Sequence, residues 1–421
     1  MLLQSPSAAT DSPFMPMKLS FMRWVDYWIG IPICLLFSFL AAIKRGMGFG
    51  RIDDSFKPKK LLFIELSEMG STVLAYGAMH RARELYDAEL HFLIFEENRE
   101  SIELLGIIPD ENLHTIRSKS LPHFFSDTLG MVFRMRRQRF DAVIDLELFS
   151  RFTSILCFLS GARANVGYYK YHMEGLYRGT FQTHKVMYNP YYHMTQNFMA
   201  LISALEEVPT NEPMVKRHIP REGIARAWVE PRDEGRARVL DKLREQFAIS
   251  DNHKLVLLNA GAGSFLAIRK WPLENFVAFS RQTLKVPDAL IAIIGVPADH
   301  EEGEIIREKL GTDRFINFAG KTDNLRELVE LYHLSAALVT NDSGPAHFAS
   351  LTDIRVITLF GPETPSLYGP VGEHSFPMYS DFACSPCVSA YNHRKTKCAE
   401  NKCLQAITPE AVFEQVRPVL E

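Results

Sequence analysis

The same pattern occurs twice in this chain: a short apolar run, a glycine-containing turn, and a stretch with helical periodicity. The first copy, KKLLFIELSEMGSTVLAYGAMHRARELY, begins at Lys59, and the second, KLVLLNAGAGS, begins at Lys254. Further apolar runs alternate with helical stretches in both halves, as in FDAVIDLE (140–147) and AALVTND (336–342). Such alternation predicts parallel sheets with crossover helices. We therefore expect an α/β protein with two doubly wound halves and a ligand cleft between them, at the carboxyl ends of the strands.

The pattern is interrupted in the middle of the chain by a proline-rich stretch and a charged helix, RDEGRARVLDKLREQF. We interpret this region as the end of the first half followed by a linker. The predicted segments are a disordered tail and an apolar segment (1–57), the first half (58–215), the linker (216–251), the second half (252–407) and a C-terminal helix (408–421) that begins at Thr408 with Pro409 in its first position.

Composition excludes several classes of protein. The 421 residues carry 47 Lys and Arg against 50 Asp and Glu, so the net charge of −3 does not predict a nucleic-acid surface. A mean hydropathy of −0.07 excludes a polytopic membrane protein. Six cysteines are too few for a disulfide scaffold in a chain of this length.

One apolar run near the N-terminus, Ile29–Ile43, is a candidate membrane segment. As a helix its 15 residues would rise about 22 Å, which is short of the roughly 30 Å hydrocarbon core. Aromatic residues precede the run and Lys44 and Arg45 follow it, an order typical of an anchor at the cytoplasmic face. We expect a helix that lies in the membrane plane or re-enters it; a full span and a buried helix of the globular part are the alternatives.

The turn after the strand at 254 is rich in glycine. Gly261, Gly263 and Ser264 lie there, and the cations Arg269 and Lys270 follow within ten residues. Glycines allow a phosphate to approach the backbone closely, and a pair of cations could neutralise a diphosphate. Such turns also occur for packing reasons alone, and this one has neither the dinucleotide-binding nor the P-loop spacing.

A sharper motif is the stretch TNDSGPAH, which ends at His347. Asp342 or Ser343 can cap the helix that follows, and His347 would lie one turn into that helix. The alternative is a capped helix with a core histidine. The next strand ends in FGPETP, which brings another polar turn to the same edge of the sheet.

Together these motifs resemble glycosyltransferase family 9, the family of the ADP-heptose:lipopolysaccharide heptosyltransferases. The resemblance rests on GAGS…RKWPLENF, NDSGPAHFASL and ITLFGPETP, and extends into the first half through IELSEMGSTVLA and FDAVIDLELFSRFTSILCFLSGARANVGY. It implies a GT-B fold of two Rossmann-like domains. It also implies inverting, metal-independent sugar transfer, with the acceptor on the N-terminal half and the nucleotide-sugar donor on the C-terminal half.

Carried over by position, the resemblance assigns donor-binding residues. Those that would surround the diphosphate and ribose are Asp342, Ser343, Gly344 and His347, with Gly261, Gly263, Ser264 and Arg269 or Lys270 on the phosphates from the other side. Asp299 is a further candidate for the ribose, with a surface acid in a turn as the alternative. No cofactor is required for this chemistry, because cations and N–H groups can stabilise the departing diphosphate.

The catalytic base is where the sequence departs from the family. The family has an Asp at the end of a Ser-Ser-x-Gly-Asp stretch, whereas this chain has Ser71 there and a carboxylate three residues earlier, at Glu68. A serine hydroxyl is too weakly basic, so we expect Glu68 to take the proton. A different carboxylate or a loss of catalysis are the alternatives, and the change leaves the donor sugar open.

Four cysteines form a C-x2-C-x10-C-x4-C pattern: Cys384, Cys387, Cys398 and Cys403. This spacing suits a tetrahedral thiolate site and predicts a structural zinc. Disulfides and four unliganded thiols are the competing interpretations.

The predicted function is transfer of a heptose or another sugar to a lipopolysaccharide-type or lipid-linked acceptor, by a protein on the cytoplasmic face of the bacterial inner membrane. An epimerase or hydrolase of sugar nucleotides and a non-catalytic sugar-nucleotide-binding protein are the alternatives. Aromatic and basic residues of the first half could contact an anionic glycolipid: Arg163, Tyr168, Tyr169, Lys170, His172, Tyr177 and Arg178.

Overall fold

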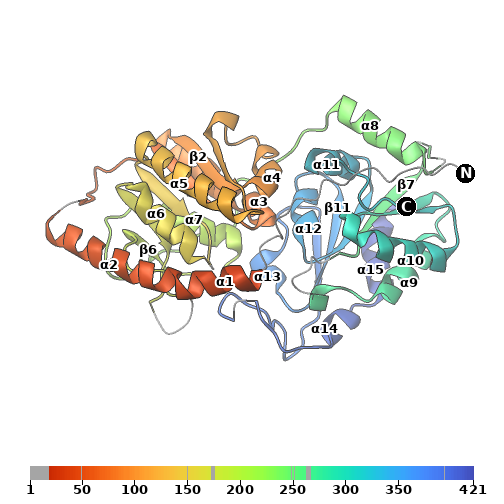
Figure 1. The fold of residues 1–421 in the computed structure, drawn as a ribbon. Coiled ribbons are helices and arrows are strands. Elements are labelled where there is room, and N and C mark those ends of the chain that lie inside the picture. Colours follow the sequence, from red (N-terminus) through yellow and green to blue (C-terminus); the bar gives the residue numbers. More distant parts are fainter. Residues whose placement is uncertain are drawn as a thin grey trace, which may run out of the picture.

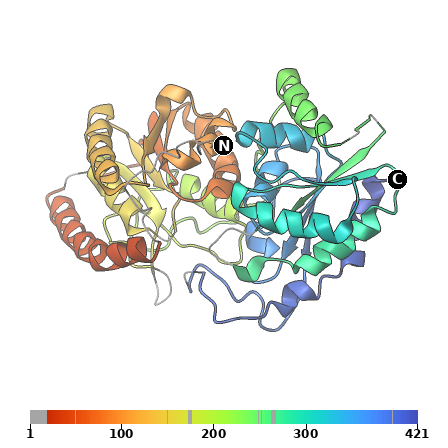
Figure 2. The ribbon, with the colours of Figure 1, turned by 45° about the vertical axis from the view of Figure 1, so that its right-hand side comes forward.

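The protein forms two lobes that lie side by side (Figures 1 and 2). The structure is a computed structural model that describes residues 19–48, 50–148, 150–171, 176–247, 249–250, 252–261, 267–392 and 394–421. Each lobe is built on one six-stranded parallel sheet, and we call them the N-lobe and the C-lobe. The prediction of an α/β protein with two doubly wound halves is confirmed.

The N-lobe sheet has the order β3-β2-β1-β4-β5-β6. Its strands are β1 (Lys60–Ile64), β2 (Glu89–Phe95), β3 (Leu113–Ile116), β4 (Ala142–Asp145), β5 (Ala164–Tyr168) and β6 (His184–Val186). In the register, Leu61 of β1 lies opposite Leu90 of β2 and Ala142 of β4. The strand order reverses between β1 and β4, so the crevice for a ligand lies beyond the carboxyl ends of these two strands.

The C-lobe sheet repeats this topology. Its strands are β7 (Lys254–Asn259), β8 (Ala289–Ile293), β9 (Phe315–Asn317), β10 (Ala337–Asn341), β11 (Arg355–Phe360) and β12 (Ser375–Tyr379), in the order β9-β8-β7-β10-β11-β12. Here β7 and β10 take the places of β1 and β4. The glycine-rich turn after β7 and the polar motif after β10 are therefore neighbours at one edge of the sheet.

Helices cover both faces of each sheet because the strands are apolar on both sides. In the N-lobe, α3 (Met69–Tyr86), α4 (Arg99–Glu103) and α7 (Met194–Ala204) pack on one face, and α5 (Leu121–Gln138) and α6 (Arg151–Ser160) pack on the other. In the C-lobe, α8 (Asp233–Arg244), α11 (Leu325–His333) and α12 (Gly344–Ala349) cover one face. The other face carries α9 (Leu273–Thr283), α10 (His300–Leu310) and α15 (Pro409–Val416), and the remaining short helices are α13 (Pro365–Tyr368) and α14 (Lys402–Gln405).

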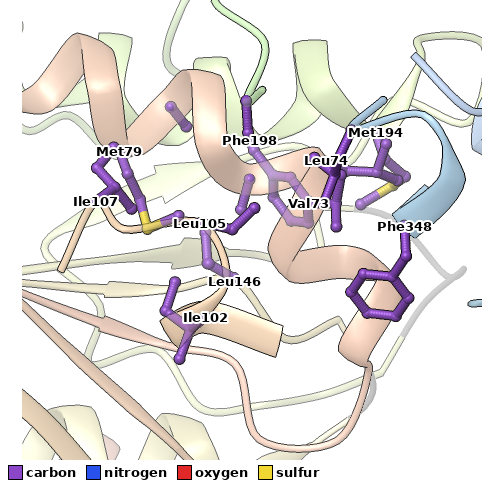
Figure 3. Close-up of a cluster of buried hydrophobic side chains, with 14 of the residues drawn as sticks. Val73, Leu74, Met79, Ile102, Leu105, Ile107, Leu146, Met194, Phe198 and Phe348 are labelled. Carbon is purple, nitrogen blue, oxygen red and sulfur yellow. The ribbon is translucent and has the colours of Figure 1, made fainter. Parts of the chain in front are cut away.

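One apolar cluster continues from lobe to lobe. Helix α12 of the C-lobe contacts α3 of the N-lobe, and Phe348 of α12 belongs to the same buried cluster as Val73 and Leu74 of α3 (Figure 3). Phe348 is 3% exposed, so the lobes meet through a dry contact immediately beside the polar strand ends. This contact places the N-terminus of α3 against the DSGPAH segment.

The N-terminal apolar segment forms two helices, α1 (Leu19–Trp28) and α2 (Gly30–Gly46), that pack on α6. Asp26 accepts hydrogen bonds from the backbone N–H groups of Arg151 and Phe152 and forms an ion pair with the Arg151 side chain at 2.8 Å. The stretch Met22–Gly46 is long and apolar enough to cross a membrane by length and composition. Only 17% of its most apolar window is buried in the protein, whereas the core helix of a soluble protein is mostly buried. Tail residues 1–18 lie outside the described part.

The predicted elements agree best where the sequence signal is long. The C-terminal helix starts as expected at Pro409, with the Thr408 hydroxyl accepting from Ala411 N–H at 3.2 Å. The strand expected within 140–147 is shorter, spanning Ala142–Asp145. Strands of only three or four residues, such as β6 and β9, carry too short an apolar run to be told from a loop.

Candidate active site

One buried asparagine joins the three predicted motifs of the C-lobe. Asn341, the last residue of β10, accepts a hydrogen bond from Trp271 N–H at 2.8 Å through Oδ1. Its Nδ2 donates to the carbonyls of Ala260 (2.9 Å) and Gly261 (3.3 Å). The glycine-rich turn, the RKWP segment and the DSGPAH motif therefore meet at the end of β10. Gly263 and Ser264 lie outside the described residues.

Beside this junction Arg269 pairs with Asp342. The guanidinium Nη1 lies 3.2 Å from Asp342 Oδ2, and both side chains are largely buried. Ser343 is the residue before α12, but its hydroxyl donates to the Asn341 carbonyl at 3.1 Å and makes no capping bond to the helix. The expected side-chain cap at this helix is therefore wrong, because the Ser343 hydroxyl closes the turn behind it instead. Gly344 begins the helix.

The other two donor-site candidates lie on the β8 side of the turn. Asp299 accepts from Val296 N–H at 3.0 Å, and a Cβ placed on Gly261 would be 2.9 Å from its carboxylate oxygen. Only a glycine at position 261 fits so close to Asp299, which explains the glycine there. Lys270 points away from Asp342 and pairs with Glu302 of α10 at 2.5 Å.

His347 faces the N-lobe. A Cβ placed on Gly70, in the first turn of α3, would lie 2.7 Å from His347 Cδ2. The ring is buried, and its Nδ1 has no hydrogen-bond partner among the described residues. Burial lowers the pKa of His347, while Asp342 and Glu68 act in the opposite direction. The histidine is thus a junction residue between the lobes and not only a core histidine of the C-lobe.

Glu68 comes directly before α3 and reaches across to the C-lobe. Its carboxylate forms a two-point ion pair with Arg394, with Nη1 at 2.5 Å from Oε1 and Nη2 at 3.4 Å from Oε2. The Ser71 hydroxyl donates to Oε2 at 2.8 Å. Burial alone would raise the pKa of Glu68, but Arg394 and Ser71 hold it below the ordinary value. Glu68 is therefore a carboxylate at neutral pH.

A second carboxyl group, Glu363, lies on the other side of Arg394. It follows β11, is 2% exposed, and neither carboxyl oxygen has a hydrogen-bond partner among the described residues. The Arg394 Nε atom is 3.8 Å from Glu363 Oε1. Burial raises the pKa of Glu363 to about 8, although Arg394 opposes the shift. Sequence reasoning noticed the polar FGPETP turn but did not single out this residue.

Two buried acids support the loop that carries Glu68. Glu147 Oε1 accepts from Leu66 N–H, Ser67 N–H and the Ser67 hydroxyl at 3.1, 3.2 and 2.8 Å, and Glu65 Oε1 accepts from Glu68 N–H at 3.3 Å. Burial raises the pKa of both side chains, and repulsion adds to it, from Glu147 and Glu68 on Glu65 and from Glu68 on Glu147. Sequence reasoning missed them, although an acid directly after a buried strand was the available signal.

Several residues suggested for an acceptor have structural roles instead. Arg178 is buried and pairs with Asp145 and Thr153 inside the N-lobe, and Tyr168 is buried in its core. The Arg163 side chain donates to the Arg51 carbonyl at 2.7 Å. His172 lies outside the described residues. A buried arginine such as Arg178 cannot be told from a binding residue in the sequence, because the sequence does not show which acid it pairs with.

The predicted zinc site at the four cysteines is not assembled among the described residues. All are free, and no three His, Cys, Asp or Glu side chains of the described residues gather in an arrangement that could hold a metal ion. Cys398 is exposed and its thiol donates to the Glu400 carbonyl at 3.1 Å, whereas Cys403 is buried at the base of the loop. The loop is instead fixed by Asn401, whose Nδ2 donates to the carbonyls of Ile268 and Lys270 at 2.9 and 2.7 Å.

Comparison with known proteins agrees with this geometry. The model of the family described as glycosyltransferase family 9 (heptosyltransferase) matches residues 131–398. The lipooligosaccharide heptosyltransferase 2 of Haemophilus influenzae is 29% identical over 185 residues, 43% of this chain and 50% of that protein. The lipopolysaccharide heptosyltransferase 2 of Escherichia coli is 28% identical over 181 residues, 42% and 49% of the two chains. These matches span about half the length of the curated relatives.

Solved structures show the same fold over almost their whole length. ADP-heptose lps heptosyltransferase II of E. coli superposes with a TM-score of 0.67 at 18% identity, covering 86% of this chain and 98% of that one. A glycosyl transferase family 9 protein from Veillonella parvula gives a TM-score of 0.67 at 19% identity, covering 88% and 99%. The two sheets thus match the GT-B arrangement of these structures. Because the family match covers more than half of the sequence, the chain belongs to glycosyltransferase family 9, the heptosyltransferase family.

Proposed function

We propose that the protein is an inverting, metal-independent glycosyltransferase. In this proposal it moves a heptose or another sugar from a nucleotide-sugar, ADP-heptose or a similar donor, to a lipopolysaccharide-type or lipid-linked acceptor. One observation carries the proposal: the start of α3 in the N-lobe meets the C-lobe at the ends of the strands, where Glu68 pairs with Arg394 and Gly70 lies against His347. Such a transfer needs a proton acceptor on one side of the sugar and stabilisation of a leaving diphosphate on the other.

The donor belongs to the C-lobe in this proposal. Arg269 and His347 would contact the diphosphate, with Asp342 holding the Arg269 guanidinium in place. Gly261 lies against the Asp299 carboxylate, and Asp299 would accept a hydrogen bond from a ribose hydroxyl. Ser343 and Gly344 supply backbone N–H groups where α12 begins, and Lys270 would contribute longer-range positive charge from its pair with Glu302.

The acceptor belongs to the N-lobe, with Glu68 as its base. The acceptor hydroxyl attacks the anomeric carbon, its proton passes to the Glu68 carboxylate, and the bond from the anomeric carbon to the phosphate oxygen breaks. The nucleoside diphosphate leaves with both bonding electrons, and the configuration at the anomeric carbon inverts. Ion pairing with Arg394 makes Glu68 a weaker base than a free carboxylate. A diphosphate that attracts Arg394 would make Glu68 a stronger base.

Glu363 is the second candidate for the base. A carboxyl group whose pKa is about 8 is better matched to proton transfer near neutral pH than one whose pKa is lowered. Against this assignment, Glu363 belongs to the C-lobe and is 2% exposed. The variants Glu68→Gln and Glu363→Gln distinguish the two, because only loss of the base lowers the rate of the chemical step by about 10²–10⁴-fold.

The N-terminal helices would hold this enzyme at the cytoplasmic face of the bacterial inner membrane, as a peripheral or monotopic protein. Large apolar residues of α2 remain exposed along one side, at Leu35, Leu36, Phe39, Leu40 and Ile43. They recur at the spacing of one helical face, and Lys44 and Arg45 close the helix. A lipid-linked acceptor would then lie within reach of the N-lobe.

The test is release of nucleoside diphosphate from a panel of nucleotide-sugars, with and without lipid acceptor. We expect release that depends on the acceptor and is lost in His347→Ala. Release or isomerisation without any acceptor would indicate a hydrolase or epimerase. Tight donor binding without turnover would indicate a binding protein. No binding of any donor would contradict the proposal altogether.

A further inference from the structure

Helix α5 of the N-lobe carries an exposed apolar ridge that the function described so far does not use. The ridge consists of Leu121, Phe125, Leu129 and Phe133, which are 41, 65, 59 and 68% exposed. They are spaced four residues apart, so they form one line along the helix. The core side of α5 is formed by other residues, among them Met131 and Met135, so the ridge has no packing role in the N-lobe.

Exposed apolar side chains of the protein are concentrated in one region. Of the 20 large hydrophobic residues exposed among the described residues, ten lie between Trp24 and Met47, four form the α5 ridge, and the other six are scattered singly. Isolated exposed apolar residues are ordinary, whereas a line of them marks an interaction surface. Helix α6 contacts both α2 and α5, and Figures 1 and 2 show it between them.

The charges around the ridge match an anionic surface. The only acid of α5, Asp127, is neutralised by a two-point pair with Arg117, at 2.8 and 2.7 Å. The helix ends in a basic run with Arg134, Arg136 and Arg137, and Arg139 follows it. Apolar residues followed by a basic cluster occur in both α2 and α5, and this order is typical of helices that lie on anionic lipid.

We propose that the α5 ridge is a second membrane-docking element, which with α2 fixes the orientation of the N-lobe on a bilayer that contains anionic lipid. The inference rests on the proposed attachment of the enzyme to the membrane through its N-terminal helices. It adds the α5 ridge, which attachment through those helices alone does not require. A single helix can hold a protein on a membrane while leaving it free to rotate. Two helices on either side of α6 define a face, and they keep the strand ends that carry Glu68 at a constant distance from a lipid acceptor.

The experiment measures binding of the full chain to vesicles of phosphatidylcholine with 30% phosphatidylglycerol, on the order of the anionic content that such surfaces need. The test variant is Phe125→Ser/Leu129→Ser/Phe133→Ser. The matched control is Met187→Ser/Val208→Ser/Ile305→Ser, which removes three scattered exposed apolar residues. We expect the partition coefficient of the α5 variant to fall at least about tenfold, and that of the control to stay within about twofold of the wild type. Donor turnover with a water-soluble acceptor should be unchanged in both.

Hydrogen exchange of the wild type with and without vesicles is the second measurement, since it needs no variant to fold. We expect protection of residues 121–133 as well as of α2. Wild-type binding to vesicles with no effect of the α5 variant and no protection of 121–133 would overturn the ridge while leaving α2 and the proposed activity in place. A change in oligomeric state of the α5 variant without a change in vesicle binding would assign the ridge to a second copy and also overturn the proposal. Wild-type chain that does not bind vesicles at all would overturn both membrane elements but not the chemistry.

Discussion

The two lobes have the same strand order, yet the residues at the ends of their central strands are chemically opposite. In the N-lobe, β1 and β4 lead into the acids Glu65 and Glu147, which hold the loop of Glu68. In the C-lobe, β7 and β10 lead into a glycine turn and Asn341, which gather Arg269 and the segment of His347. The same topology therefore underlies both strand-end regions, and the residues at and just after the end of each strand decide whether the region carries carboxylates or cations.

The lobes also differ in how their charges are balanced. Arg394 comes from the C-lobe but pairs with Glu68 of the N-lobe, so the acid loop of one lobe is neutralised by a cation of the other. Arg269, by contrast, pairs with Asp342 inside its own lobe. The charge of the N-lobe acid is thus balanced across the contact between the lobes, whereas the charge of Arg269 is balanced within the C-lobe.

The largest expected effect tests the acid side of this comparison. Glu68→Gln should lower kcat by about 10²–10⁴-fold, because the acceptor proton loses its base. Donor affinity should not fall by calorimetry, since the proposed donor contacts are in the C-lobe. Ser71→Ala is the matched control, because it removes only the hydroxyl that donates to Glu68. A fall of less than about threefold in Glu68→Gln would remove Glu68 from this role and favour Glu363.

The next effect tests the cation side. Arg269→Lys keeps the positive charge beside Asp342 but loses the planar guanidinium group, which can donate two hydrogen bonds to one phosphate. The donor Kd should therefore rise about tenfold. Arg281→Lys is the control, because Arg281 donates to the Lys309 carbonyl on the far side of α9 and faces no part of the site. Isothermal titration with ADP-heptose or the donor found in the turnover panel measures both variants. Equal donor affinities for Arg269→Lys and the wild type would show that Arg269 only supports Asp342.

A third prediction concerns the contact between the lobes. Gly70→Ala places a methyl group 2.7 Å from His347 Cδ2, so the ring or the lobe must shift, and we expect kcat/KM to fall several-fold to about tenfold. Gly130→Ala in α5 meets nothing within 4 Å and should instead stabilise the fold by up to about 1 kcal/mol. Small-angle scattering should show a larger radius of gyration for Gly70→Ala. Unchanged kinetics and an unchanged radius would mean that the close approach is not needed.

The smallest effect is a pH dependence of stability. Glu363 has a pKa of about 8 in the folded protein and an ordinary one when unfolded, so the folded state holds the proton more tightly. Its contribution is complete below the unfolded pKa and is lost as the pH rises through about 8. The glutamine side chain of Glu363→Gln is neutral at every pH. The Tm of this variant minus that of the wild type should therefore increase by about 2 °C or more between pH 5 and pH 9. The exposed Glu373→Gln is the control. A constant difference in Tm would show that Glu363 is not held neutral in the fold.

Much of this comparison was predictable from sequence, because two repeats of strand, glycine turn and helix determine two parallel sheets and the edge where a ligand binds. Asp342, His347 and Glu68 were also predictable, since each lies within a few residues of the end of a recognisable strand or the start of a helix. Arg394 and Glu363 were not, because their roles come from a contact between segments 326 residues apart and from burial that no local pattern records. The four-thiolate site is not assembled among the described residues, and regular spacing in a loop does not by itself determine where the side chains point.

The most direct test is a crystal structure of the full chain soaked with a mixture of nucleotide-sugars. We expect the retained diphosphate to contact Arg269 and His347, with the anomeric carbon facing the Glu68 carboxylate across space for one hydroxyl, whose oxygen would lie about 3 Å from both. A nucleotide-sugar bound away from these residues, or bound with its anomeric carbon turned from the N-lobe, would contradict the account.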